Sequence, residues 1–94
     1  MNRLELSAVV VHRGALRYTP AGLPALDIEL LHESEVVHEG QPRKVSMSLK
    51  ALAIGSLVGP VSAMALGHPA TFGGYLATAR NGRGLLFHLT ALQG

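Results

Sequence analysis

Five short segments of this chain alternate aliphatic residues with polar or small ones, and this pattern limits the chain to an all-β fold. Successive side chains of a strand point to opposite faces, so a period of two predicts strands with one buried face. Phe72 and Phe87 fall on positions that are predicted to face the core. The five predicted strands are residues 4–10, 26–31, 45–50, 70–76 and 85–92.

Glycine and proline mark the predicted turns between these strands. After a short extended piece at residues 15–18, the Thr-Pro-Ala-Gly run at 19–22 is typical of a type I turn. Asn81-Gly82 predicts a tight type I′ hairpin, because both central residues of that turn need positive φ. Gly73-Gly74 predicts a bend or bulge. Residues 32–42 are polar and contain glycine and proline, so they are predicted to form a loop.

Residues 51–67 are predicted to connect the third and fourth strands through a short helical or irregular segment. Gly55, Gly59 and Pro60 interrupt any long helix there. The wider stretch 51–79 contains no Asp, Glu, Lys or Arg. A membrane-spanning helix needs about 20 predominantly apolar residues in a row, and glycines and prolines break this stretch too often. We therefore expect a buried or dimer-facing segment and no membrane span.

The size of the chain predicts one domain, residues 1–94, with a thin core. Five short antiparallel strands are compatible with a five-stranded barrel of the oligonucleotide-binding (OB) type, and equally with other small barrels or sandwiches. The first strand is apolar on both faces near Val9, Val10 and Val11. Because an exposed strand edge is a template for pairing, we expect a homodimer through the first strand. The alternative is that Val9 and Val11 are covered within one subunit.

Charge is distributed unevenly along the chain, although the net charge is only +2. The acidic residues of the middle segment are Asp27, Glu29, Glu33, Glu35 and Glu39. The basic residues form three groups, namely Arg3, Arg13 and Arg17; Arg43, Lys44 and Lys50; and Arg80 and Arg83. Local basic clusters permit a modest groove for a polyanion. On charge alone, an ordinary solvated surface is the simpler interpretation.

Catalytic and metal-binding constellations are not recognisable in this sequence. The chain has no cysteine, and none of its five histidines falls at a zinc-motif spacing. There is no phosphate loop, dinucleotide fingerprint or nucleophile elbow. Asp27 and Glu29 would share a strand face, but we interpret them as solvated surface and expect them away from any bound polyanion. We expect no enzyme activity, no cofactor and no metal.

The cellular location is predicted from two weak signals. Met-Asn-Arg-Leu-Glu at residues 1–5 carries a glutamate within the would-be apolar stretch, so it is not typical of a signal peptide. The absence of cysteine suits a reducing compartment. We therefore expect the cytoplasm.

Two runs of residues resemble the bacterial single-stranded DNA-binding proteins. One is Asn-Arg-Leu-Glu-Leu-Ser at residues 2–7, followed by an aliphatic strand; the other is Leu-Arg-Tyr-Thr-Pro-Ala-Gly at 16–22, followed by Leu-Asp-Ile at 26–28. The segment after His32-Glu33-Ser34 and the basic Asn81-Gly82 hairpin resemble the shorter primosomal replication protein N (PriB) family. This resemblance implies an OB fold, a homodimer, single-stranded DNA binding, and a role in replication restart beside the primosomal helicase and other primosome proteins.

The resemblance implies where the DNA would bind. OB proteins hold nucleic acid on the face of the second and third strands and on the flanking loops. Cations there would neutralise phosphates, and aromatic rings would stack on bases. The residues predicted to bind nucleic acid are Arg43, Lys44, Lys50, Arg80, Arg83, Tyr18, Tyr75, Arg13 and Arg17. Tyr18 and Tyr75 can also cover the edge of a core, and Arg13 and Arg17 can equally pair with the acidic segment.

The chain departs from the PriB pattern at two aromatic positions. Gln41 and Ser46 stand where the family carries a loop aromatic and a tryptophan, and this chain has no tryptophan. Stacking on an aromatic ring is worth about 1–3 kcal/mol per base, so we expect weaker and more electrostatic binding. The alternative function is a protein-interaction module on the same fold, with weak or no DNA binding and residues 33–39 as an acidic docking loop. RNA is also a compatible ligand.

Overall fold

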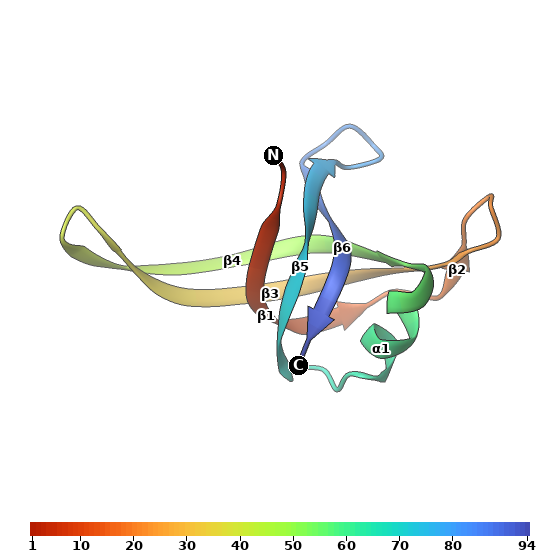
Figure 1. Ribbon diagram of the computed structural model, residues 1–94, viewed down its shortest axis with the longest axis horizontal. Coiled ribbons are helices and arrows are strands. Elements are labelled where there is room, and N and C mark those ends of the chain that lie inside the picture. The colour runs from red at the N-terminus through yellow and green to blue at the C-terminus, as the bar shows by residue number, and fades with distance from the viewer.

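The computed structural model describes residues 1–94 and consists of six strands, a single turn of 3₁₀ helix and one short α-helix (Figure 1). The strands are β1 (Leu4–Arg13), β2 (Arg17–Tyr18), β3 (Pro24–His38), β4 (Gln41–Ile54), β5 (Pro69–Thr78) and β6 (Leu85–Gln93). The 3₁₀ turn is Gly55–Leu57, and α1 (Val58–Ala63) follows it directly. Neither helix has the length needed to cross a membrane.

Five long strands close into a barrel, as the sequence predicts. The hydrogen-bonded order is β1-β5-β6-β4-β3-β2, and a further pairing of β1 with β3 completes the circle. The strand β1 pairs with two strands. Its residues Leu4–Val9 pair with β5, and its residues Val9–Arg13 pair with β3. A register shift between Val10 and His12 marks the bend. The pairing of β4 with β6 is parallel and brings Leu52 beside His88.

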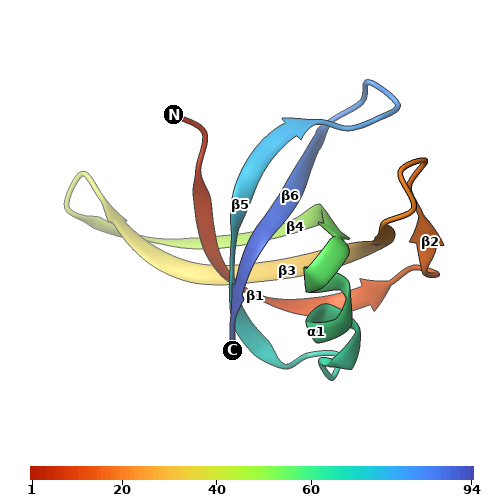
Figure 2. The same cartoon turned by 45° about the vertical axis from the view of Figure 1, so that its right-hand side comes forward.

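The core lies inside this barrel and is closed at one end by α1. Phe72, Phe87, Leu30, Val10 and Val61 are fully buried, which confirms the inward positions predicted for the two phenylalanines. Gly55 adopts positive φ at the end of β4, and the helix that follows has only six residues. The prediction of a short helical connection between the third and fourth long strands is thus confirmed. Figure 2 shows α1 packed beside the ends of β3 and β1.

A bulge between Gly73 and Gly74 lets β5 follow the curvature of the barrel. The register of β5 on β6 shifts between these two residues, which confirms the predicted bulge. At Gly74 the backbone of β6 comes so close that a Cβ atom would lie 1.8 Å from the carbonyl oxygen of His88. Only glycine fits there, and its absence of a side chain allows the close approach.

The prediction of a loop at residues 32–42 is wrong. β3 continues to His38 and β4 begins at Gln41, so the two strands form a long ribbon that projects beyond the barrel (Figure 1). The turn consists of Glu39 and Gly40, which have φ of 52° and 73°. Both faces of this ribbon meet water at residues 33–42, which carry no apolar alternation. The polar sequence therefore indicated solvent exposure, and it did not indicate an irregular backbone.

The prediction of a type I′ turn at Asn81-Gly82 is also wrong. Gly82 and Gly84 adopt positive φ, whereas Asn81 does not. The amide of Gly82 donates to the Ala79 carbonyl at 2.8 Å, and the amide of Ala79 donates to the Gly84 carbonyl at 3.0 Å. The Asn81 side chain accepts a hydrogen bond from the amide of Arg83 at 2.9 Å. Because Gly84 supplies a second left-handed position, the chain forms a wider loop.

Candidate nucleic-acid interface

An open groove of about 660 Å³ lies between β2 and its turn, the outer face of β4, and the β5–β6 loop. In Figure 2 the β2 turn and the β5–β6 loop rise from the same side of β3 and β4. The groove is at the end of the barrel away from the tip of the projecting ribbon. It brings together five of the predicted nucleic-acid-binding residues: Arg17, Tyr18, Lys50, Arg80 and Arg83.

The strand β2 supplies the first wall of the groove. Arg17 pairs with Ala25, and Tyr18 pairs with Pro24, at the start of β3. The turn that follows is closed by a 2.8 Å hydrogen bond from the Gly22 amide to the Thr19 carbonyl, as expected from its Thr-Pro-Ala-Gly sequence. Tyr18 is 66% exposed, so most of its ring is accessible for stacking.

Lys50 reaches the groove because of the alternation along β4. Its neighbours Leu49 and Ala51 face the barrel interior, so Lys50 lies on the outer face. Its partner across the strands is Glu29. Glu29 is half-buried, and no ion pair joins the two side chains.

Arg80 and Arg83 supply the opposite wall, on the β5–β6 loop. Both side chains are exposed, and neither has a carboxylate within ion-pair distance. The Asn81 side chain holds the amide of Arg83 and so gives the loop a defined shape. These two arginines and Lys50 are three cations of the groove whose charge is not neutralised by an ion pair.

Arg17 differs from the other cations because Asp27 binds it at two points. The Arg17 Nε and Nη2 atoms donate to the two Asp27 carboxylate oxygens at 3.0 and 3.2 Å. The hydrogen bond to Asp27, and then its negative charge, raise the pKa of Arg17 above its usual value. The sequence left open whether Arg17 pairs with the acidic segment, and this contact shows that it does. The cause is the pairing of β2 with β3, which sets Arg17 and Asp27 side by side.

Tyr75 and His88 form a stacked pair on neighbouring strands. They are direct partners of β5 and β6, with ring centroids 4.8 Å apart and an interplanar angle of 3°. His88 lines the groove, whereas Tyr75 lies on the far side of His88. Sequence reasoning missed His88, because it weighed histidines only as metal ligands. Its outward position next to the buried Phe87 was the signal that could have identified it.

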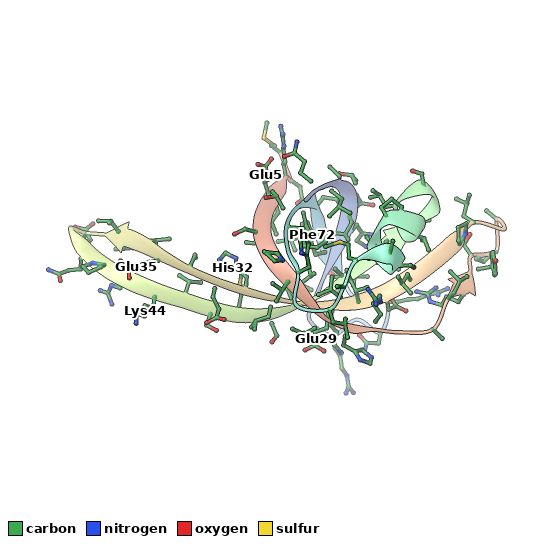
Figure 3. The ribbon with its side chains drawn as sticks, turned by 90° about the horizontal axis from the view of Figure 1, so that it is seen from below. Glu5, Glu29, His32, Glu35, Lys44 and Phe72 are labelled. Carbon is green, nitrogen blue, oxygen red and sulfur yellow. The ribbon has the colours of Figure 1, made fainter.

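The remaining predicted site residues lie outside the groove. Arg43 and Lys44 are on the projecting ribbon, where they pair with Val36 and Glu35. Figure 3 shows Lys44 and Glu35 on this ribbon. Lys44 shares the outer face of β4 with Lys50, whereas Arg43 occupies the opposite face. The segment predicted as an acidic docking loop, residues 33–39, consists of the outer part of β3 and the first residue of the turn.

Arg13 is engaged elsewhere in the fold. Its Nη1 atom donates to the backbone carbonyls of Val61 and Met64, at the C-terminal end of α1. The last carbonyls of a helix lack partners within the helix, and Arg13 supplies one. The side chain therefore connects β1 with α1 and does not line the groove.

Comparison with known proteins identifies related sequences and structures. Residues 2–91 match the family model described as another single-strand binding protein family. The chain is 51% identical over 80 residues to the replication restart protein PriB of Bordetella pertussis, covering 85% of this chain and 75% of that protein. The solved structure of PriB from Ralstonia solanacearum has a TM-score of 0.91 at 32% identity, covering 99% and 96% of the two chains.

A more distant solved structure bears on the fold alone. The SSB domain of a protein from Synechococcus sp. has a TM-score of 0.72 at 20% identity, covering 100% of this chain and 96% of that one. Together with the closed five-strand barrel, this likeness confirms the prediction of an OB fold.

Proposed function

The chain belongs to the PriB family of replication restart proteins, and from this membership we propose that it binds single-stranded DNA in the groove between β2, β4 and the β5–β6 loop. The observation that carries the proposal is the convergence of four cations from three separate elements: Arg17, Lys50, Arg80 and Arg83. We propose a binding role without catalysis.

Electrostatics supply the larger part of the proposed affinity. Cations that neutralise phosphates release condensed counterions, which makes binding favourable and sensitive to salt. Tyr18 offers an exposed ring beside these cations, and base stacking on such a ring does not depend on sequence. The stacked Tyr75–His88 pair offers a second flat surface next to the groove. We propose that longer DNA reaches Lys44 and Arg43 along the ribbon.

We further propose that residues 1–94 act as one domain that forms a homodimer through β1. In support, residues Leu4 to Ala8 pair only with β5, so their other edge has no partner strand within the chain. Val11 is 42% exposed, which disfavours the alternative that one subunit covers it. Sedimentation at micromolar concentration is expected to give twice the mass of one chain. A single-chain mass would contradict the dimer.

The proposed partners follow from the family role. Since the chain is similar to a replication restart protein, we propose that it contacts the primosomal helicase and other primosome proteins, and that it lies in the cytoplasm. The alternative function is a protein-interaction module with weak or no DNA binding. It is favoured by Val36 and Val37 on the ribbon, which are 45% and 77% exposed.

Binding of a fluorescent oligo-dT at several salt concentrations tests the DNA-binding proposal. Arg80→Ala/Arg83→Ala is expected to weaken binding by about tenfold or more, because two unpaired cations leave the groove. The slope of log affinity against log salt should become shallower by about 1.4, since each contact to single-stranded DNA contributes about 0.7.

A matched control separates the groove from net charge. Arg43→Ala/Lys44→Ala removes the same charge from the ribbon, and it is expected to weaken binding of a short oligonucleotide much less. Equal losses in the two variants would contradict the proposed position of the site. Failure of the wild-type protein to bind at low salt would reject DNA binding and favour the interaction module.

A further inference from the structure

Asp27 is the one carboxylate among the residues that line the groove. It faces Arg17, whose Nε and Nη2 atoms donate to the two carboxylate oxygens at 3.0 and 3.2 Å. The two side chains are exposed, with 41% of Arg17 and 56% of Asp27 open to solvent. A ligand that enters the groove therefore meets this pair directly.

The backbone around Asp27 holds the carboxylate in place. The amide of Gly14 donates to the Asp27 carbonyl at 2.8 Å, on one side of β3. On the other side Asp27 pairs with Leu52 of β4. Arg17 pairs with Ala25, two residues before Asp27. Because side chains two residues apart share a face, both charged side chains lie on the same face of the sheet. The contact is thus a consequence of the fold and is present before any ligand arrives.

The guanidinium group of arginine can bind either a carboxylate or a phosphate in the same way, by donating two hydrogen bonds to two oxygens. Asp27 therefore occupies the position on Arg17 that a phosphodiester group of DNA would take. Both anions cannot use the guanidinium group in this way together, and a phosphate placed beside an unpaired carboxylate would be repelled.

We propose that Asp27 is an internal competitor for DNA phosphate: it occupies Arg17 in the free protein and is displaced when a phosphodiester group binds there. The inference rests on the proposed function of the groove and names a regulation of that same site. Lys50, Arg80 and Arg83 have no ion-pair partner, so they are available for the first contact. Arg17 joins afterwards, when it exchanges Asp27 for a phosphate.

This exchange limits affinity without preventing binding. An ion pair open to water is worth little, since water and salt screen it, so a phosphate can replace the carboxylate. The replaced carboxylate remains close to the DNA and can recapture Arg17. The expected result is weaker binding and faster release than the same four cations would give alone.

Asp27→Asn tests the exchange, because asparagine keeps the shape of the side chain and removes its charge. The variant is expected to bind oligo-dT about three- to tenfold more tightly at low salt, with a salt slope steeper by up to about 0.7. Glu39→Gln makes the same change in net charge at the ribbon tip, far from the groove. It is expected to change the affinity for a short oligo-dT, which does not extend to the ribbon, by less than about twofold.

The double variant Arg17→Ala/Asp27→Asn distinguishes exchange from general repulsion. If Asp27 acts by occupying Arg17, the gain from Asp27→Asn is expected to be largely lost in the Arg17→Ala background. A gain of equal size in both backgrounds would mean that Asp27 acts only as a nearby negative charge, and would overturn the proposal.

Two other outcomes have separate meanings. Wild-type binding with no gain in Asp27→Asn would overturn the exchange and leave the DNA-binding function intact. No binding by the wild-type protein would reject the function itself, and the exchange with it. Circular dichroism of each variant shows whether the fold is retained.

Discussion

Gly74→Ala is expected to lower the free energy of unfolding by about 2–4 kcal/mol, the range of strongly overpacked sites. The new Cβ atom would lie 1.8 Å from the His88 carbonyl oxygen and 3.0 Å from Cε1 of Phe87. The first of these groups is backbone, so β6 must move away from β5. In a domain of this size, each kcal/mol lowers the melting temperature by about 4–8 °C. Urea denaturation and thermal melting measure both quantities.

Gly73→Ala is the matched control for this substitution. Its Cβ atom would lie 3.4 Å from the Cβ atom of Ala91, an ordinary contact. The free energy of unfolding should therefore change by less than about 1 kcal/mol. Equal destabilisation by the two substitutions would show that the close approach of β6 at Gly74 is not the cause. Because His88 follows the movement of β6, Gly74→Ala should also disturb its stacking on Tyr75.

Arg13→Ala is expected to lower the free energy of unfolding by about 2–3 kcal/mol, since hydrogen bonds from a charged group are among the stronger ones. The substitution leaves the carbonyls of Val61 and Met64 without this donor. It also removes the connection between β1 and α1. The salt slope of oligo-dT binding should stay as in the wild-type protein, because Arg13 does not line the groove. Urea denaturation and a salt titration together check the prediction.

Arg3→Ala provides the comparison for an exposed arginine. Arg3 is 76% exposed and lies 3.9 Å from Glu5, a geometry that contributes little to stability. Its loss should change the free energy of unfolding by about 0.5 kcal/mol or less. Suppose instead that Arg13→Ala unfolds like the wild-type protein and binds DNA with a shallower slope. Arg13 would then be a DNA contact, as its sequence position first indicated.

The barrel was predictable because buried and exposed residues alternate along strands that pack on a core. In the final strand, Phe87 and Leu89 are buried while Thr90 is exposed, and a pattern of this kind is visible in the sequence alone. The ribbon was not predictable on the same grounds. Beyond His32 no core lies under β3, so nothing in the pattern distinguishes an exposed strand from a loop. In the β5–β6 loop, the positive φ of Gly84 determines the geometry. The turn prediction rested on the dipeptide Asn81-Gly82 alone and did not consider Gly84.

The sequence named the cations and the tyrosine that line the groove, but it did not show how separate elements build the groove. Arg17 and Tyr18 came from a short recognisable run, and Lys50 came from alternation along its strand. Distance along the chain gave no sign that the β5–β6 loop would face β2 across a groove. A contact of Arg17 with the acidic segment was left open by the sequence. The pairing of β2 with β3 selects Asp27, ten residues after Arg17, as the partner.

The projecting ribbon of β3 and β4 has a consequence for how such a chain can vary. Its outer part, from Glu33 to Ser46, is joined to the barrel only through its own two strands. Side chains repeat every two residues, so adding or removing two residues from each strand would keep every core residue on its inward face. The ribbon can therefore change in length during evolution while the barrel stays the same. The distance that the ribbon extends from the barrel can thereby evolve separately from the fold.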